Sequence, residues 1–251
     1  MFTVASLWRH PIKSHGREAL DAVTLTKGQT MPFDRRWAVT HEQTKFDSAH
    51  PKWEKCRNFM IGAVNPSIAG IWARFDEGRG IMHLQHVQTG EISFDPDDPI
   101  DVTRFLNWIA PLTAHIASQP TALVSAGERG MTDTPFPSLT VMNTASHDAV
   151  ATQLGQALEP ERWRGNIWLD GAKPWAEWDW IGQDLRIGTA TLRMQERCVR
   201  CNHTNANPVT GVRDVDTLGA LRDGWDHTDF GVYCEVIESG HIKIGDTAKV
   251  L

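Results

Sequence analysis

The sequence predicts a mainly β protein with a few short helices (α+β), built on a barrel-type core. Short apolar segments recur along the chain, glycines separate them, and only three segments have helical spacing or capping. Strands do not alternate regularly with helices, as a doubly wound sheet would require. At 251 residues the chain can form one large domain or two packed subdomains.

The first half is predicted to be rich in strands. These strands cover residues 2–9, 22–26, 37–41, 59–64, 71–75, 81–85 and 91–94. A helix is predicted from Asp101 to Ala110, where Pro111 stops it. Residues 113–135 then form a mixed connector with Gly127 and Gly130. We therefore divide the chain into an N-terminal β-rich domain, residues 1–120, and a second domain, residues 121–251.

The second half opens with a strand at 139–142 and a helix that Thr144 or Ser146 caps. Val150, Leu154 and Leu158 recur every four residues, as one buried helical stripe requires, and Pro160 ends the helix. A third helix is predicted over 215–222, capped by Asp214 or Asp216. The remaining predicted strands cover residues 167–169, 185–187, 190–196, 199–203, 231–237, 242–244 and 247–250.

Composition excludes several classes of protein. The chain is 41% hydrophobic and 22% charged, like an ordinary globular protein, and its net charge of -6 predicts neither nucleic acid nor an anionic membrane as a partner. Four cysteines do not make a disulfide scaffold and suggest a reducing compartment. The N-terminus lacks the features of a signal peptide, and no apolar run approaches the about 20 residues that span a bilayer. These features predict a cytoplasmic protein, with most of its 11 Trp in the core.

The most informative segment is Cys198-Val199-Arg200-Cys201, with Asn207 to Gly211 behind it. A thiolate is a soft metal ligand, and an adjacent guanidinium favours the thiolate and can bind an anion. Three other readings remain open from these residues alone: an ordinary buried strand pair, half of a zinc site, and a redox CxxC. The flanking residues predict a strand that runs into a loop, whereas a redox CxxC favours a helix start.

Three further polar segments follow or precede predicted strands. Lys13 and Ser14 provide a positive charge and a hydroxyl that suit a phosphate, and Arg35 enters a strand within Asp34-Arg35-Arg36-Trp37. Arg164 and Asn166 are two residues apart, so an extended chain points them to the same side. Each segment alone is equally typical of a solvated surface.

Taken together, these segments resemble the MOSC family, the molybdenum cofactor sulfurase C-terminal domain with its N-terminal β-barrel partner. Within that family the chain resembles the amidoxime-reducing component group. The resemblance covers almost the whole chain and depends on order, spacing and flanks. It rests on 11–14, Gly28, 34–37, 133–143, 162–171, Trp180, 185–188, 198–201, Thr204, Pro208, 210–211, 230–233 and 242–246. Two positions depart from the family pattern: Gly165 replaces a proline, and Asn207 replaces an aspartate.

The resemblance implies a MOSC-type β-barrel core packed with an N-terminal β-rich subdomain, and a bound molybdenum cofactor, Mo-molybdopterin. It implies that Cys201 is the metal ligand and that Cys198 is not. Arg35 and Arg164 are expected to hold the cofactor rather than the fold, so that Arg35→Ala costs about 1 kcal/mol or less, like a surface substitution. The residues that match cofactor-contacting positions are Lys13, Ser14, Arg35, Arg164, Asn166, Arg200 and Tyr233.

The implied activity is a two-electron reduction of small N-hydroxylated or N-oxide compounds, with electrons from a separate donor protein. A non-enzymatic carrier of molybdenum cofactor or sulfur is the alternative, and a zinc or CxxC redox module is a further one. No proton donor is assigned, and His203 is expected to be merely exposed. If one cofactor joins the two halves, Lys13, Ser14 and Cys201 must converge on one cavity although they are far apart in sequence.

Overall fold

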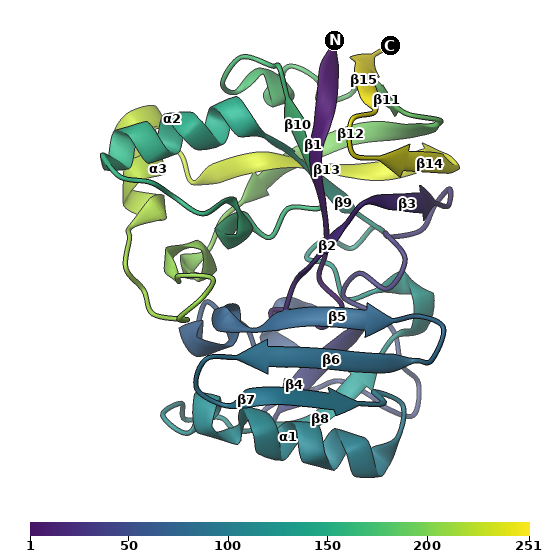
Figure 1. The fold of residues 1–251 in the computed structure, drawn as a ribbon, viewed down its shortest axis with the longest axis vertical. Helices are drawn as coiled ribbons and strands as arrows, with labels where there is room; N and C mark the ends of the chain where they lie inside the picture. Colours follow the sequence, from purple (N-terminus) through teal and green to yellow (C-terminus); the bar gives the residue numbers. More distant parts are fainter.

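In the computed structural model, which describes residues 1–251, a closed ring of strands forms one half of the molecule (Figure 1). Strand β1 (Phe2–Arg9) pairs with both β15 (Thr247–Val250) and β10 (Ile167–Asp170), which closes the sheet into a barrel. Between these strands the order continues through β9 (Leu139–Asn143), β13 (Asp229–Glu238), β12 (Ala190–Val199) and β11 (Asp184–Ile187). The predicted β-barrel core in an α+β protein is therefore confirmed.

The barrel encloses the largest apolar cluster of the protein. The inward-facing residues of its strands include Val4 and Leu7 of β1, which are 1% and 0% exposed. These two residues are three positions apart and still face the same side, because the register shifts between Val4 and Ser6. The cluster contains 20 buried residues from all parts of the ring. This burial explains why the alternation of apolar residues predicted most of these strands within one or two residues.

The first 25 residues belong with strands from the end of the chain. Strand β2 (Glu18–Leu20) pairs with β1, and β3 (Ala22–Leu25) pairs with β14 (Gly240–Lys243). The two termini consequently lie side by side, as Figure 1 shows. The division at residue 120 remains a prediction. The strand pairs show that β1 and β3 belong to sheets formed with strands of the second half, although they precede residue 120.

The other half of the molecule, below the barrel in Figure 1, contains two small sheets and one long helix. An antiparallel sheet is formed by β5 (Trp72–Asp76), β6 (Ile81–His86) and β7 (Gly90–Phe94). A second sheet pairs β4 (Trp37–His41) with β8 (Pro120–Ser125). Strand β8 lies within residues 113–135, which were predicted to be a connector. Its residues are half-buried except for the exposed Thr121, so no buried face marks the segment as a strand.

The three helices are capped by side chains that the sequence patterns located only in part. Helix α1 (Pro99–Thr113) starts at Asp98, whose carboxylate accepts two backbone N–H groups, and it continues through Pro111. Asn143, rather than Thr144 or Ser146, caps α2 (Thr144–Leu154), which ends at Gly155 instead of Leu158. Helix α3 (Thr217–Trp225) is capped by Asp216. The structure contains no helix that is long and apolar enough to cross a membrane.

Two predicted strands are absent, and one of these errors matters for the site. Residues 59–64 form turns, with a single bridge between Phe59 and Thr40. Residues 199–203 do not form a separate strand, because β12 ends at Val199 and a 3₁₀ turn, η6 (Asn202–Asn205), follows. Other 3₁₀ turns are Cys56–Asn58, Pro66–Gly70, Gly127–Arg129, Pro160–Trp163 and Ala176–Trp178.

Candidate functional site

One cavity of about 200 Å³ collects residues from both halves of the molecule. Lys13, Ser14 and Cys201 all line it, so the predicted convergence of these distant positions is confirmed. The other lining residues are Arg35, Cys56, Ile61, Gly62, Ala63, Asp133, Thr140, Arg162, Trp163, Arg164, Val199, Arg200, His203, Thr204 and Tyr233. Asn166 is the one sequence-predicted site residue that does not line this cavity.

The two cysteines of the CxxC segment have opposite environments. Cys201 is exposed at the start of η6, and its carbonyl oxygen accepts hydrogen bonds from the backbone N–H and the hydroxyl of Thr204, at 3.2 and 3.1 Å. Cys198 is fully buried in β12, and burial raises the pKa of its thiol to about 12. Of these two cysteines only Cys201 lines the cavity, and this difference argues against a redox CxxC.

The arrangement of side chains does not support a zinc site. Nowhere in the chain do three or more His, Cys, Asp or Glu side chains gather as they would to hold a metal ion. Structural zinc requires four such ligands. A metal at Cys201 would consequently depend on a ligand that the protein does not itself provide.

Lys13 is buried, and its ammonium group is held by two oxygen atoms. It donates to the carbonyl oxygen of Met131 at 2.7 Å and pairs with the carboxylate of Asp133. The thiol of Cys56 donates to the same carboxylate at 3.1 Å. Burial, followed by the charge of Asp133, raises the pKa of Cys56 to about 11. Sequence reasoning missed Asp133 and Cys56 as cavity residues, since their positions depend on long-range folding.

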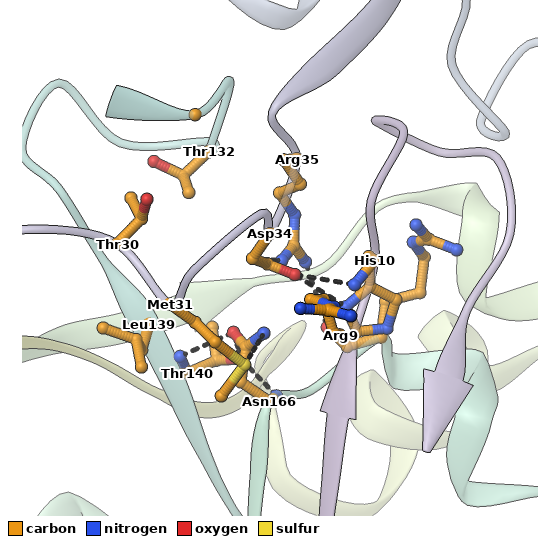
Figure 2. A network of polar contacts seen from close by, with 12 residues as sticks. Arg9, His10, Thr30, Met31, Asp34, Arg35, Thr132, Leu139, Thr140 and Asn166 are labelled. Atoms are coloured by element: carbon orange, nitrogen blue, oxygen red, sulfur yellow. Dashed lines mark hydrogen bonds and ion pairs between the residues drawn. The ribbon is translucent and has the colours of Figure 1, made fainter. Parts of the chain in front are cut away.

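Arg35 is part of a buried polar network, which Figure 2 shows from close by. Its guanidinium pairs with Asp34 and donates to the carbonyl oxygen of Arg164 at 3.1 Å. Asp34 also accepts the backbone N–H of His10 at 2.8 Å. Burial opposes the charge on Asp34, but Arg35 and His10 outweigh it and lower its pKa. Because Arg35 is only 8% exposed, the expectation that it behaves as a surface residue is wrong.

Arg164 has an incompletely satisfied guanidinium at the cavity wall. One amino group donates to the carbonyl oxygen of Gly16 at 3.0 Å, whereas its Nη2 is buried without a partner. Burial, together with the nearby charge of Arg35, lowers the pKa of Arg164 to about 9. A buried cation that lacks a counterion costs free energy, and an anion in the cavity would remove that cost.

Asn166 does not line the cavity but joins elements of the barrel, and Figure 2 shows its side chain beside Thr140. Its side-chain oxygen accepts the backbone N–H and the hydroxyl of Thr140, at 3.1 and 3.0 Å. Its amide group donates to the carbonyl oxygen of Trp8 at 3.2 Å. With these bonds made and only 1% of the residue exposed, Asn166 supports the strands around the cavity rather than facing into it.

Arg200 and Tyr233 complete the wall beside Cys201. The Arg200 guanidinium donates to the carbonyl oxygens of Phe230 and Trp163, at 2.8 and 2.9 Å, and pairs with no carboxylate. Burial raises the pKa of the Tyr233 phenol, so this group remains a neutral hydroxyl. With Arg164 and Arg200 both free of carboxylate partners, the cavity is locally positive in a protein of net charge -6.

Two more cavity residues were not assigned from the sequence. Arg162 is buried and pairs with Glu159 and Asp214. His203 is 8% exposed, so the expectation that it is merely exposed is wrong. Its ring packs against Gly62, where an added Cβ would lie 2.0 Å from the ring Nδ1. The contacts of Arg162 with Asp214 and of His203 with Gly62 join segments that are distant in sequence, so no local pattern signals them.

Comparison with known proteins accounts for most of the chain. Residues 132–249 match the MOSC domain, and residues 1–101 match the MOSC N-terminal beta barrel domain. Mitochondrial amidoxime-reducing component 1 of Xenopus laevis is 30% identical over 118 residues, which are 42% of this chain and 34% of that protein. Mitochondrial amidoxime reducing component 2 of Homo sapiens is 30% identical over 121 residues, which are 43% and 35%. The match thus spans about a third of the length of these relatives.

Among solved structures, the YUAD protein from Bacillus subtilis aligns over 99% of this chain and 94% of its own. The TM-score is 0.46 and the sequence identity is 13%. YiiM from Escherichia coli aligns over 45% of this chain and 53% of its own, with a TM-score of 0.34 and 16% identity.

Proposed function

Because this chain belongs to the MOSC family, with a MOSC N-terminal β-barrel domain ahead of its MOSC domain, we propose that it binds a molybdenum cofactor and reduces N-hydroxylated compounds. The observation that supports this most directly is the pairing of two features in one cavity. One is the exposed thiol of Cys201, and the other is the buried, unpartnered Nη2 of Arg164. A soft ligand beside an uncompensated cation suits a metal complex that carries negative charge.

The donor set fits such a group along the whole cavity. Lys13, Ser14, Arg35 and Arg164 provide ammonium, hydroxyl and guanidinium donors for phosphate and pterin oxygens. Arg200 lies next to Cys201 and would offset negative charge around the metal. Asn166 would act from below, since its bonds to Thr140 and Trp8 hold the strands that frame the cavity.

In this proposal the protein binds and orients the cofactor, while the redox chemistry belongs to the cofactor. When bound, the cofactor would supply a molybdenum centre that accepts an oxygen atom from an N–OH or N-oxide group. Cys201 would provide the one protein thiolate that holds the metal. Cys198 would stay a protonated, buried thiol. Val199, Ile61 and Ala63 would provide apolar contacts in an otherwise polar cavity.

The substrate class and the need for an electron donor also belong to this proposal. The relatives in Xenopus laevis and Homo sapiens are named as amidoxime-reducing components, which suggests a small N-hydroxylated substrate. These relatives are named as components, which supports our proposal that a separate protein delivers the electrons.

The test is to produce the protein in a host that synthesises the cofactor and to measure molybdenum, pterin and turnover. Reduced methyl viologen as electron donor and an aryl amidoxime as substrate remove the need for a natural partner. We expect about one molybdenum per chain and amidoxime-dependent dye oxidation, both lost in C201A. Molybdenum and pterin without turnover would favour a cofactor carrier. Zinc or no metal would contradict the proposal.

A further inference from the structure

The loop after Cys201 is tied to the cavity wall by one guanidinium. The side chain of Arg162 is 2% exposed and forks onto Asp214, with Nη1 at 2.8 Å from Oδ1 and Nη2 at 3.1 Å from Oδ2. Its Nη1 also donates to the carbonyl oxygen of Asn205 at 3.3 Å, and its Nε contacts Glu159 at 2.7 Å. Arg162 therefore joins η4 (Pro160–Trp163) to both ends of the loop between η6 and α3.

Asn207 stands at the centre of this arrangement and uses both ends of its side chain. Its Oδ1 accepts the backbone N–H groups of Val209 and Thr210, at 2.9 and 3.1 Å, which folds the loop into an Asx turn. Because Oδ1 accepts two N–H groups, the amide orientation is determined. Its Nδ2 then donates to Asp214 at 2.8 Å and lies 3.5 Å from Glu159.

An aspartate at position 207 could still accept the two backbone N–H groups of the turn, but it could not keep the hydrogen bond to Asp214. A carboxylate cannot donate to Asp214, and it would be the third acid around a single guanidinium. The family pattern has an aspartate at this position, whereas here the acid that pairs with Arg162 is Asp214. The amide at 207 and the carboxylate at 214 are therefore complementary.

We propose that Asn207, Asp214 and Arg162 form a latch that positions the Cys201 loop, and that an acid at 207 is tolerated only if 214 loses its acid. Arg162 lines the same cavity as Cys201 and bonds to Asn205 at the end of η6, so the latch holds the segment that follows the thiol. These are positioning residues, and their role rests on the proposed function of Cys201 as the metal ligand. The coupling between positions 207 and 214 does not require the cofactor.

The experiment compares N207D, D214N and N207D/D214N in the cofactor-free full chain. Hydrogen exchange, resolved to peptides that cover residues 201–216, measures the opening of the loop. We expect N207D and D214N each to speed exchange in these peptides by about fivefold or more, which corresponds to about 1 kcal/mol. The double variant should return to within about twofold of the unchanged protein, while peptides from α1 stay constant throughout.

N107D is the matched control, because it makes the same amide-to-acid change at an exposed position of α1. It should leave the loop peptides unchanged. R162K keeps the charge but loses the fork, so it should open the loop as D214N does, even if N207D fails to fold. The proposal is overturned if the double variant exchanges as fast as N207D, or if exchange rises equally in all peptides.

Molybdenum retention then separates the latch from the proposed function. In protein loaded in a cofactor-producing host, N207D should lose molybdenum during dialysis several-fold faster than N207D/D214N does. If the unchanged protein binds no molybdenum while loop exchange follows the expected order, the latch stands and the proposed function fails. If molybdenum binds equally in all variants and exchange is unaltered, the latch is wrong and the proposed function stands.

Discussion

The guanidinium of Arg35 donates to the backbone carbonyl of Arg164 at 3.1 Å, although the two residues are 129 positions apart. Both residues have left-handed backbone conformations, with φ of +51° and +50°. Arg35 therefore fixes the backbone of Arg164, whose own Nη2 stays without a partner at the cavity. This contact joins the two halves of the molecule at the proposed cofactor site, so in our proposal one residue serves both cofactor binding and folding.

Arg35→Ala should strongly destabilise the cofactor-free protein. The substitution leaves Asp34 as a buried carboxylate without its cation, and breaking a buried pair in this way costs about 3–5 kcal/mol. Urea unfolding followed by circular dichroism measures the loss. The double variant D34N/R35M should be less destabilised than the sum of the single changes, because it removes the unpaired charge. If R35A lowers the free energy of unfolding by about 1 kcal/mol or less, Arg35 behaves like a surface residue, as the sequence analysis expected.

Cys201→Ala and Cys198→Ala should have opposite consequences. C201A removes the only cysteine of the pair that faces the cavity, so molybdenum content and dye-driven turnover should fall to background with little change in melting temperature. C198A removes a buried thiol, so it should lower stability by about 1 kcal/mol and retain most of the molybdenum. Metal analysis and thermal unfolding of both variants decide this, and the reverse pattern would rule out Cys201 as the ligand.

Restoring the family's proline at position 165 should be harmful here because of Met142. A Cβ at Gly165 would lie 2.3 Å from the Cγ of Met142, which is fully buried. Overpacking of this kind costs about 1–3 kcal/mol. G165P should therefore unfold at lower urea concentration, and M142A should relieve part of the loss, so that the double variant is more stable than additivity predicts. If the free-energy changes of G165P and M142A are strictly additive, the contact with Met142 is not the reason for a glycine at position 165.

The cofactor-free protein should lose stability as the pH falls below about 6.5. Burial, followed by the charge of Arg164, lowers the pKa of His10 to about 3, and burial lowers that of His15 to about 4. The unfolded chain therefore binds protons that the folded protein does not, and each histidine removes up to about 1.4 kcal/mol per pH unit between its two pKa values.

Urea unfolding at pH 7, 6 and 5 measures this slope. In H15Q the side chain can still donate to the carbonyl oxygen of Lys13 but no longer titrates. Its stability should decline less steeply with falling pH than that of the unchanged protein. Parallel slopes for the two proteins would show that His15 does not contribute to the acid sensitivity.

Local sequence patterns predicted those strands and helices whose formation depends mainly on residues within the element itself. The strands Phe2–Arg9, Trp37–His41 and Thr247–Val250 have the predicted bounds, because each is a short run of apolar and β-branched residues that ends at a turn. The predicted strand over 199–203 failed because the chain turns at Cys201, where the Thr204 hydroxyl bonds back to the Cys201 carbonyl. The motifs around Lys13, Arg35, Arg164 and Cys201 predicted these four cavity residues, since their order along the chain resembled one family.

Contacts between distant segments decided the rest. The pairing of β1 with both β10 and β15 closes the barrel, and no feature within β1 specifies its two partners. Asp133 and Cys56 reach Lys13 only in the folded chain, and Asn166 turns away from the cavity because Thr140 and Trp8 bind its amide. Residue type and spacing thus predict which groups can bind an anion. Burial and long-range partners determine which guanidinium has no carboxylate partner in the folded protein and is therefore available to bind one.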